Sequence, residues 1–347
     1  MKASFTAVSE HPSISRRRFM ASLALGSLAA YGAEAAAGAV TFAPAGAQPL
    51  AWREGLAPRR VAIVGDVQRT GMLEMLLLGR HQNDAERVAV LRAIAEEGPE
   101  MLLMLGDQVV TGDGRAWEYF DSIMEPVRRA GIPVHGMLGN HDYEGEKAPV
   151  CIENFNQRFP HQRDRIHGLT RLGPLALLTL DSNFPSLSDR QIGEQARRYA
   201  QTLAELDAAP DVRCVIVASH HPPYTNSSLH AGKDLKQVEE MFAAPFLHAR
   251  KTRLYLSGHV HSYERFVMAG SGKTFVISGG GGGPRRTVDI TEHRPYRNDA
   301  YREGTLRPFH FMVMTVHDDR LAFEVRMLVQ RGAWRFRTGD TFDVRFA

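Results

Sequence analysis

Cysteine is scarce in this chain: Cys151 and Cys214 are the only two among 347 residues. Two cysteines cannot form the disulfide framework that holds small secreted domains together. Cys214 lies in an apolar run, which favours a buried thiol, and a single bridge between the two is an open alternative because export would permit it. The hydrophobic fraction of 44% instead predicts a fold stabilised by a substantial core.

The chain also lacks an excess of charge of one sign. It has 42 basic and 39 acidic side chains, for a formal net charge of +3 with histidine neutral. A strongly basic face for nucleic acid or for an anionic membrane is therefore not expected. The glycine run at 279–283 lacks the Lys-Ser/Thr ending of a nucleotide-binding phosphate loop, which excludes that class of site.

The first 47 residues have the features of an export signal rather than of a folded segment. Residues 15–20 (Ser-Arg-Arg-Arg-Phe-Met) resemble the twin-arginine signal, and the apolar run 21–33 is shorter than the ~20 residues of a membrane span. Small residues at 45–47 suit signal peptidase. We therefore expect a signal peptide at 1–47 that engages the twin-arginine export machinery. The remainder, 48–347, is expected to be one periplasmic or secreted domain with no stable membrane span after processing; a disordered basic tail or a retained anchor is the alternative.

Apolar strand-like runs alternate with helical periodicity along most of 48–347. The runs at 60–65 and 101–105 flank a predicted helix at 84–97, an order that calls for parallel pairing of the two strands. Further strands are predicted at 133–138, 175–180, 212–218, 253–257 and 274–278, with antiparallel strands from residue 309. Further helices are predicted at 117–130, 153–158, 189–206 and 238–249. This pattern predicts an α/β fold of two stacked sheets flanked by helices.

Five successive strand-like runs end in a side chain that can bind a metal ion. These side chains are Asp66, Asp107, Asn140, His220 and His259. Ligand sites in α/β proteins form at the carboxyl ends of parallel strands, because the loops there converge. The pattern therefore predicts one common site rather than five unrelated polar turns.

Each motif taken alone is weak evidence for a metal site. An Asp after a strand often caps a turn, and two histidines on a strand are commonly only solvated. His259 and His261, however, share one side of an extended backbone, because residues i and i+2 do so. The sequence Gly-Asn-His-Asp at 139–142 contains a His and an Asp that a turn does not need. The ordered set is therefore more specific than any of its members.

This ordered set resembles the motifs of the calcineurin-like metallophosphoesterases, a family that includes the purple acid phosphatases. The resemblance extends from Asp66 to at least His261. It implies a four-layer α-β-β-α sandwich in which helices flank two mixed β-sheets. It also implies two divalent or trivalent metal ions bridged by one carboxylate and a hydroxide, and the mixed oxygen and nitrogen ligands suit Mn, Fe, Zn or Co.

The resemblance assigns ligands to both metals. Asp107 matches the bridging carboxylate, and Asp66 and His261 match ligands of the first metal. The ligands of the second metal are matched by Asn140, His220 and His259.

Three further residues match roles in catalysis. His141 matches the histidine that contacts the phosphate and protonates the leaving group as a general acid. Asp142 would orient His141 through the other ring nitrogen. His230, ten residues after His220, matches a substrate-facing histidine of the purple acid phosphatases.

Two positions depart from the family pattern. The family commonly has a second ligand, often His, two residues after the first Asp, and this chain has Gln68 there. The Gln68 amide oxygen could coordinate the metal or hold a water, but it is a weaker and neutral ligand. Purple acid phosphatases have a tyrosine three residues after the bridging Asp, where this chain has Val110, so a purple ferric site is not expected.

The sequence therefore predicts an exported, metal-dependent phosphatase or phosphodiesterase that acts on a small phosphoester and binds no nucleic acid. Two bound cations would neutralise the phosphate oxygens and supply hydroxide for in-line attack, with His141 protonating the leaving oxygen. The alternative from another class is an exported metal- or phosphate-binding protein with lapsed catalysis, which Gln68 suggests.

Overall fold

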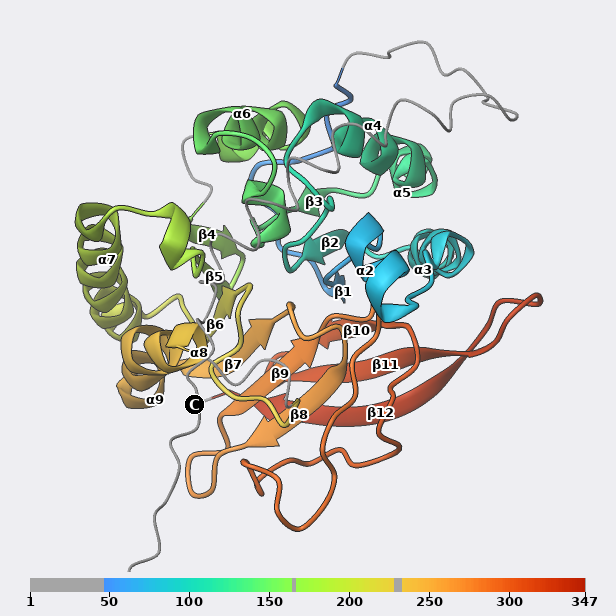
Figure 1. Ribbon diagram of the computed structural model, residues 1–347. Coiled ribbons are helices and arrows are strands. Elements are labelled where there is room, and N and C mark those ends of the chain that lie inside the picture. Colours follow the sequence, from blue (N-terminus) through green and yellow to red (C-terminus); the bar gives the residue numbers. More distant parts are fainter. Residues whose placement is uncertain (1–46, 164–166, 228–232, 347) are drawn as a thin grey trace, which may run out of the picture. The chain divides into compact units, whose positions relative to one another are not determined.

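Two six-stranded β-sheets form the centre of the structure, a computed structural model that describes residues 47–163, 167–227 and 233–346 (Figure 1). The predicted signal peptide lies almost entirely outside the described residues and stays a prediction. Within the described ranges, no helix combines the length and apolar character needed to cross a membrane.

The first sheet joins three parallel strands to three antiparallel C-terminal strands. Its order is β12-β11-β10-β1-β2-β3, in which β1, β2 and β3 are parallel and β10 is antiparallel to β1. The bounds are β1 Arg60–Val64, β2 Met101–Met104, β3 Val134–His135, β10 His310–Val316, β11 Arg320–Gln330 and β12 Arg335–Arg345.

The second sheet has four parallel strands between two antiparallel edge strands. Its order is β4-β5-β6-β7-β9-β8, and β5, β6, β7 and β9 are parallel. The bounds are β4 Gly168–Leu172, β5 Leu175–Leu180, β6 Cys214–Ser219, β7 Thr252–Ser257, β8 Tyr263–Val267 and β9 Thr274–Ser278.

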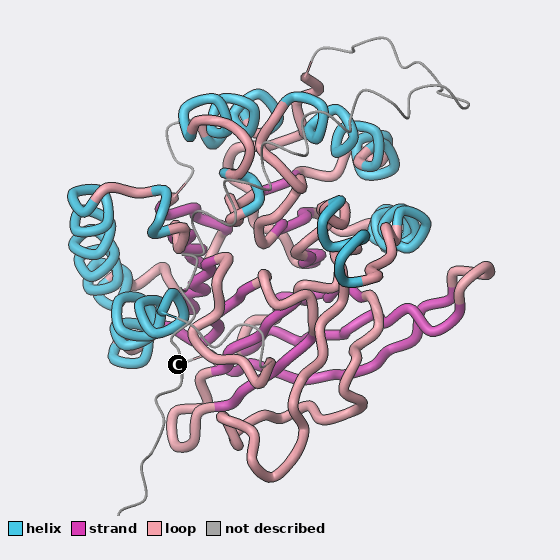
Figure 2. The backbone as a smooth tube through the Cα atoms, viewed as in Figure 1, coloured by secondary structure: helices cyan, strands magenta, loops and turns pink. Residues whose placement is uncertain are grey.

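Helices pack on the outer face of each sheet, as the tube in Figure 2 shows. On the first sheet these are α3 Asp84–Glu97, α4 Gly114–Ile123, α5 Glu125–Arg129 and α6 Ala148–Arg158. On the second sheet, α7 Asp189–Ala208 lies beside α8 Lys233–Val238, a π-helical segment Glu239–Ala243 and α9 Ala244–His248. A short helix, α2 Met72–Leu78, follows the loop after β1.

The alternation of side chains along the strands creates three apolar cores. On β1, Ala62 and Val64 pack with the helices of the first sheet, whereas Val61 and Ile63 pack between the two sheets. On β6, Val215 and Val217 face α7 and α9. Because neighbouring residues of a strand point to opposite faces, buried strands of this kind must be covered on both sides. The predicted four-layer α-β-β-α sandwich is confirmed.

Several predicted element boundaries were wrong. The single helix predicted at 117–130 is two helices: Asp113 caps α4 by accepting hydrogen bonds from two backbone N–H groups, and α5 begins at Glu125 with Pro126 in its first turn. The helix predicted at 153–158 already begins at Ala148 in α6. The one predicted at 238–249 begins at Lys233 and contains the π-helical segment.

Among the α-helices and strands of the described residues, α2, β4 and β8 were not predicted. The two missed strands lie at the edges of the second sheet, and each carries polar residues that interrupt the apolar pattern. The thiols of Cys151 and Cys214 are buried and free, so the alternative of a bridge between them is wrong.

Two histidines are buried in the core with no ion-pair partner among the described residues. His135 on β3 and His310 on β10 are almost completely inaccessible. Burial lowers the pKa of His135 to about 3, with a smaller contribution from His161. Burial also lowers the pKa of His310 to about 4. The folded state therefore keeps both rings neutral where the unfolded chain, with a pKa near 6.5, takes up protons.

We expect acid to remove the stabilisation that these two neutral rings contribute to the fold. The contribution of these two rings is complete above pH 6.5 and is lost as the pH falls toward 4, because only the unfolded state binds the protons. The contribution of each of these two histidines to the free energy of unfolding should fall by about 1.4 kcal/mol per pH unit. Urea unfolding of the metal-free wild type and of the double variant His135→Gln, His310→Gln at pH 7.5 and 5.5 measures this. As the pH falls, the difference in unfolding free energy between the two proteins should shift against the wild type; a difference that does not change with pH would contradict the assignment.

Candidate metal centre

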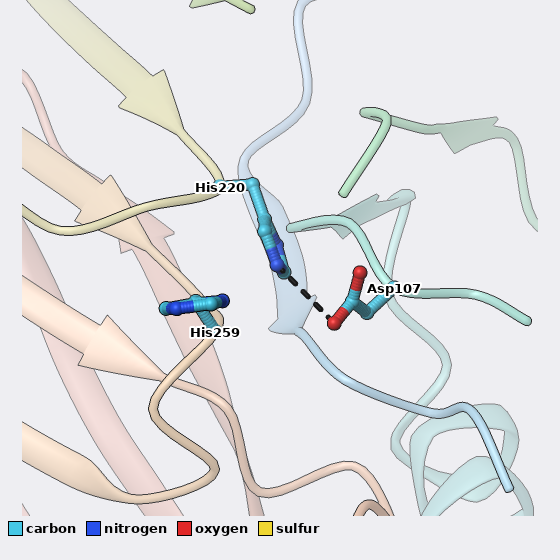
Figure 3. Close-up of side chains that lie close together, drawn as sticks. All are labelled: Asp107, His220 and His259. Carbon is cyan, nitrogen blue, oxygen red and sulfur yellow. Dashed lines mark ion pairs between the residues drawn. The ribbon is translucent and has the colours of Figure 1, made fainter. Parts of the chain in front are cut away.

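The strand tips named from the sequence converge between the two sheets. Asp66 and Asp107 follow β1 and β2, while His220 and His259 follow β6 and β7. Figure 3 shows Asp107, His220 and His259 gathered at one place from the loops that follow three different strands. The carboxyl ends of the parallel strands of both sheets thus contribute to one site.

Two groups of potential metal ligands share one carboxylate. The first group is Asp66, Asp107 and His261, and the second group is Asp107, His220 and His259. Within each group one ligand atom per residue lies within 4.8 Å of the others. Asp107 is common to both groups, as the bridging role assigned to it requires.

The shortest distances between ligand atoms match the edges of a coordination sphere. His220 Nε2 lies 3.3 Å from Asp107 Oδ2, and His261 Nε2 lies 3.3 Å from an oxygen of Asp66. Asn140 Oδ1 lies 2.9 Å from His259 Nδ1 and 3.3 Å from His220 Nε2, which places it with the second group. Metal–ligand bonds of about 2.0–2.2 Å put neighbouring ligand atoms roughly 3.0–3.4 Å apart.

Backbone carbonyls select the ring tautomer of two of the histidines. His220 Nδ1 lies 2.8 Å from Leu105 O, and His261 Nδ1 lies 2.9 Å from Pro284 O. A carbonyl only accepts, so Nδ1 carries the hydrogen and donates, and Nε2 keeps its lone pair. In both rings Nε2 faces a carboxylate, and two acceptors at this distance need a cation or a proton between them. The residues therefore fit a metal centre.

The electrostatics of the cluster favour positive charge. Burial by itself lowers the pKa of His220, but the Asp107 carboxylate outweighs burial and raises it to about 9. Burial raises the pKa of Asp107, yet His220 and His141 together hold it well below its usual range. The negative electrostatic potential that raises the pKa of His220 in the absence of metal also attracts metal ions.

Strained backbone is concentrated at the candidate ligands. Asp66, Asp107, His259 and His261 have φ values of 60°, 52°, 68° and 53°, the left-handed region that residues with a side chain rarely adopt. Such conformations persist only where the surrounding structure holds them, and they are common at functional sites. A Cβ atom at Gly139 would lie 2.2 Å from Asp107 Oδ1, which explains the glycine before Asn140.

Backbone N–H groups orient the two carboxylates. His259 N donates to Asp66 at 2.9 Å, and His141 N donates to Asp107 Oδ1 at 2.9 Å. Each carboxylate is thus held by the loop that follows another strand, so the ligand loops position one another.

His141 lies beside the two groups with its side chain 26% exposed. Its Nδ1 lies 3.1 Å from Val110 O and 3.3 Å from a carboxylate oxygen of Glu144. Burial opposes the charged ring, but the carboxylates of Asp107 and Glu144 raise the pKa of His141 to about 10. Glu144 was not identified from the sequence, although its place three residues after His141 on one turn was a usable signal.

The predicted role of Asp142 is wrong. Its buried carboxylate accepts hydrogen bonds from the backbone N–H groups of Gln108, Val109 and Gly139, at 2.9, 3.1 and 2.7 Å. Among the described residues, the partners of His141 Nδ1 are instead Val110 and Glu144. Asp142 therefore ties the loop after β2 to the loop after β3.

Gln68 lies between two of the candidate ligands. Its Nε2 lies 3.2 Å from Asp107 Oδ2 and 3.0 Å from His261 Nε2, while its Oε1 is buried without a partner in the described structure. The amide nitrogen that faces the site cannot coordinate a metal, and a rotation of the amide would bring Oε1 there. Coordination by Gln68 stays a prediction. His230 lies outside the described residues, and its role also stays a prediction.

Comparisons with known proteins agree on one family. The sequence model of the family described as calcineurin-like phosphoesterase matches residues 59–263. The chain is 26% identical to tartrate-resistant acid phosphatase type 5 of Sus scrofa, over 57% of this chain and 63% of that protein. The match thus spans less than two thirds of that relative's length.

Solved structures share the fold. A purple acid phosphatase from yellow lupin seeds superposes with a TM-score of 0.58 at 16% identity, over 83% of this chain and 54% of that one. A dimetal phosphatase from Danio rerio superposes with a TM-score of 0.55 at 15% identity, over 84% of this chain and 100% of that one.

Proposed function

Since the chain belongs to the calcineurin-like phosphoesterase family, we propose that it is a phosphoester hydrolase whose activity depends on two bound metal ions. The sharing of Asp107 between the two ligand groups is the observation that supports this most directly. Asp66 and His261 would complete the first metal site. Asn140, His220 and His259 would complete the second.

Bound metal ions would neutralise the phosphate oxygens and supply a hydroxide nucleophile near neutral pH. The protein's own residues hold the ligand loops and deliver a proton. His141 is partly exposed next to the shared carboxylate, where its Nε2, when it carries a proton, can protonate the leaving oxygen of a small phosphoester. Cations on Asp107 would weaken the effect of that carboxylate and bring the pKa of His141 down toward neutral pH.

Export through the twin-arginine route, with a mature protein that begins near Gln48, is part of the proposal. The support is that the chain from Gln48 onward belongs to the folded domain, which a cut at this point would leave whole. Gln48 O accepts from Arg128, Leu50 N donates to Arg158 O at 2.8 Å, and Ala51 O accepts from Val134 N at 2.9 Å.

The test is hydrolysis of p-nitrophenyl phosphate and of bis-p-nitrophenyl phosphate by chelated protein reconstituted with Mn, Fe, Zn or Co. Metal-dependent turnover of either ester supports the proposal, and the ratio separates a phosphatase from a phosphodiesterase. The alternative, a metal- or phosphate-binding protein without catalysis, is favoured by the neutral Gln68. Bound metal with no turnover of either ester would support it instead.

The variant Gln68→His is expected to strengthen metal binding in the first site. An imidazole at this position would supply a lone pair where the amide now presents a hydrogen-bond donor to His261. Elemental analysis after equilibration with limiting metal should find more metal per chain. Gln68→Asn, whose shorter side chain adds no ligand, serves as the control. Equal metal content in both variants would contradict this expectation.

A further inference from the structure

One arginine lies completely buried behind the first metal site. Arg87, in the first turns of α3, has no exposed surface. Its Nη2 donates to three backbone carbonyls: Gln68 O at 2.6 Å, Gln82 O at 3.0 Å and Gly282 O at 3.1 Å. Its Nη1 donates to Asp84 and to Tyr119. A buried cation is costly unless it is paired and hydrogen-bonded, so these contacts account for its presence.

Two of those carbonyls belong to loops beside the first metal site. Gln68 lies in the loop after β1, which contains Asp66, and Gly282 lies in the glycine loop 279–283 after β9. The two loops also pair directly, because Gly281 N donates to Gly65 O and Gly283 N donates to Asp66 O, at 2.9 and 2.8 Å. Arg87 thus adds side-chain hydrogen bonds to the backbone hydrogen bonds that already join the two loops.

The glycine loop in turn orients a ligand. Pro284, directly after it, provides the carbonyl that accepts from His261 Nδ1 and so turns Nε2 toward Asp66. Gly282 has a φ of 144°, and a Cβ atom there would lie 2.7 Å from the Cβ of Arg87. Glycine at 282 is therefore what allows the arginine to approach the loop so closely.

The left-handed backbone conformations of Asp66 and His261 are strained, so contacts with the surrounding structure must hold them. A guanidinium donates several hydrogen bonds in a planar fork, whereas an ammonium is a compact charge that cannot span two loops in the same way. Because Arg87 is the side chain that bonds to both loops, its loss should allow Asp66 and His261 to relax from their facing arrangement.

We propose that Arg87 is a positioning residue for the first metal site, holding Asp66 and His261 in the geometry that binds the ion. This rests on the proposed function, since it presupposes a metal there. Partners that orient metal ligands typically change metal affinity by about 10- to 100-fold when removed.

The experiment measures stepwise metal affinity by competition with a chromophoric chelator, in the wild type and in Arg87→Met. We expect the affinity of one of the two sites to fall at least tenfold and that of the other to stay within a factor of three. The ring of His261 is oriented by Pro284 O, directly after the glycine loop, whereas Nδ1 of His220 faces Leu105 O and Nδ1 of His259 faces Asn140 Oδ1. Arg87→Lys keeps the buried charge, which favours folding. Its affinity for metal at the weakened site should lie between those of the wild type and Arg87→Met. Thermal unfolding of each metal-free variant is recorded in parallel.

Arg158→Met provides the matched control. Arg158 is also buried, and its side chain bonds to Asp121, Asn154 and Gln157, away from the ligand loops. Arg158→Met should lower the Tm of the metal-free protein without changing the metal affinity of either site. If Arg87→Met or Arg87→Lys lowers Tm but keeps both affinities, Arg87 is only structural and the inference fails while the proposed function stands. A wild type that binds no metal would overturn both.

Discussion

Replacing Asp107 with asparagine is expected to reduce the hydrolysis of p-nitrophenyl phosphate to the background rate and to remove most of the bound metal. The substitution keeps the size of the side chain and removes its negative charge. Asp107 is the single carboxylate common to both ligand groups, and its Oδ1 also accepts from His141 N. Both metal sites therefore lose a ligand in one change, and we expect kcat/KM to fall by roughly 10³-fold or more, equivalent to about 4 kcal/mol of transition-state stabilisation.

Elemental analysis and steady-state kinetics on the same preparation check this result. Asp211→Asn is the control for the change of charge, because Asp211 is an exposed carboxylate that pairs with Arg171 and belongs to neither group of candidate ligands. It should leave metal content and turnover unchanged. An Asp107→Asn protein with wild-type metal content and wild-type turnover would exclude the shared-carboxylate site.

The variant His141→Ala is expected to keep its metal and lose most of its kcat. The ring of His141 contributes no atom to either ligand group, whereas its backbone N–H holds Asp107 and is retained in the variant. Loss of a general acid typically costs about 10²- to 10⁴-fold. The loss should be large for alkyl phosphates, whose leaving oxygen needs a proton, and smaller for p-nitrophenyl phosphate, whose leaving group is already stable as an anion.

A series of aryl and alkyl phosphates with different leaving-group pKa values measures this dependence. His248→Ala is the control, since His248 is an exposed histidine on α9 whose Nδ1 contacts Ala244 O. Equal losses of kcat for good and poor leaving groups in His141→Ala would show that His141 binds the substrate without donating a proton.

Much of the fold could be predicted because its signals are local. The helix predicted at 84–97 matches α3 Asp84–Glu97, since the apolar residues at helical spacing lie within that segment and the closing Gly98 directly follows it. The strands β1 and β2 are buried on both faces, so they appear as continuous apolar runs. The edge strand β8 was missed because its polar residues interrupt that pattern, and pairing with β9 decides its conformation.

The members of the candidate site were identifiable because metal-binding chemistry restricts the residue type at each strand tip. Asp66, Asp107, Asn140, His220, His259 and His261 all carry side chains that few other residues could replace. Parallel strands bring their carboxyl ends together whatever the length of the intervening chain. The convergence of these six residues thus followed from residue type and order.

The partners of the other polar side chains depended on the tertiary structure. Asp142 was expected to orient His141 but bonds to backbone N–H groups, and Arg87 bonds to the carbonyls of Gln68 and Gly282. Backbone N–H and C=O groups are nearly the same in every residue, so the residue type does not reveal which backbone group a side chain will bond to. Residue type therefore revealed which side chains can bind metal, whereas only the packed loops, with their strained conformations at Asp66 and His261, reveal what holds those side chains in place.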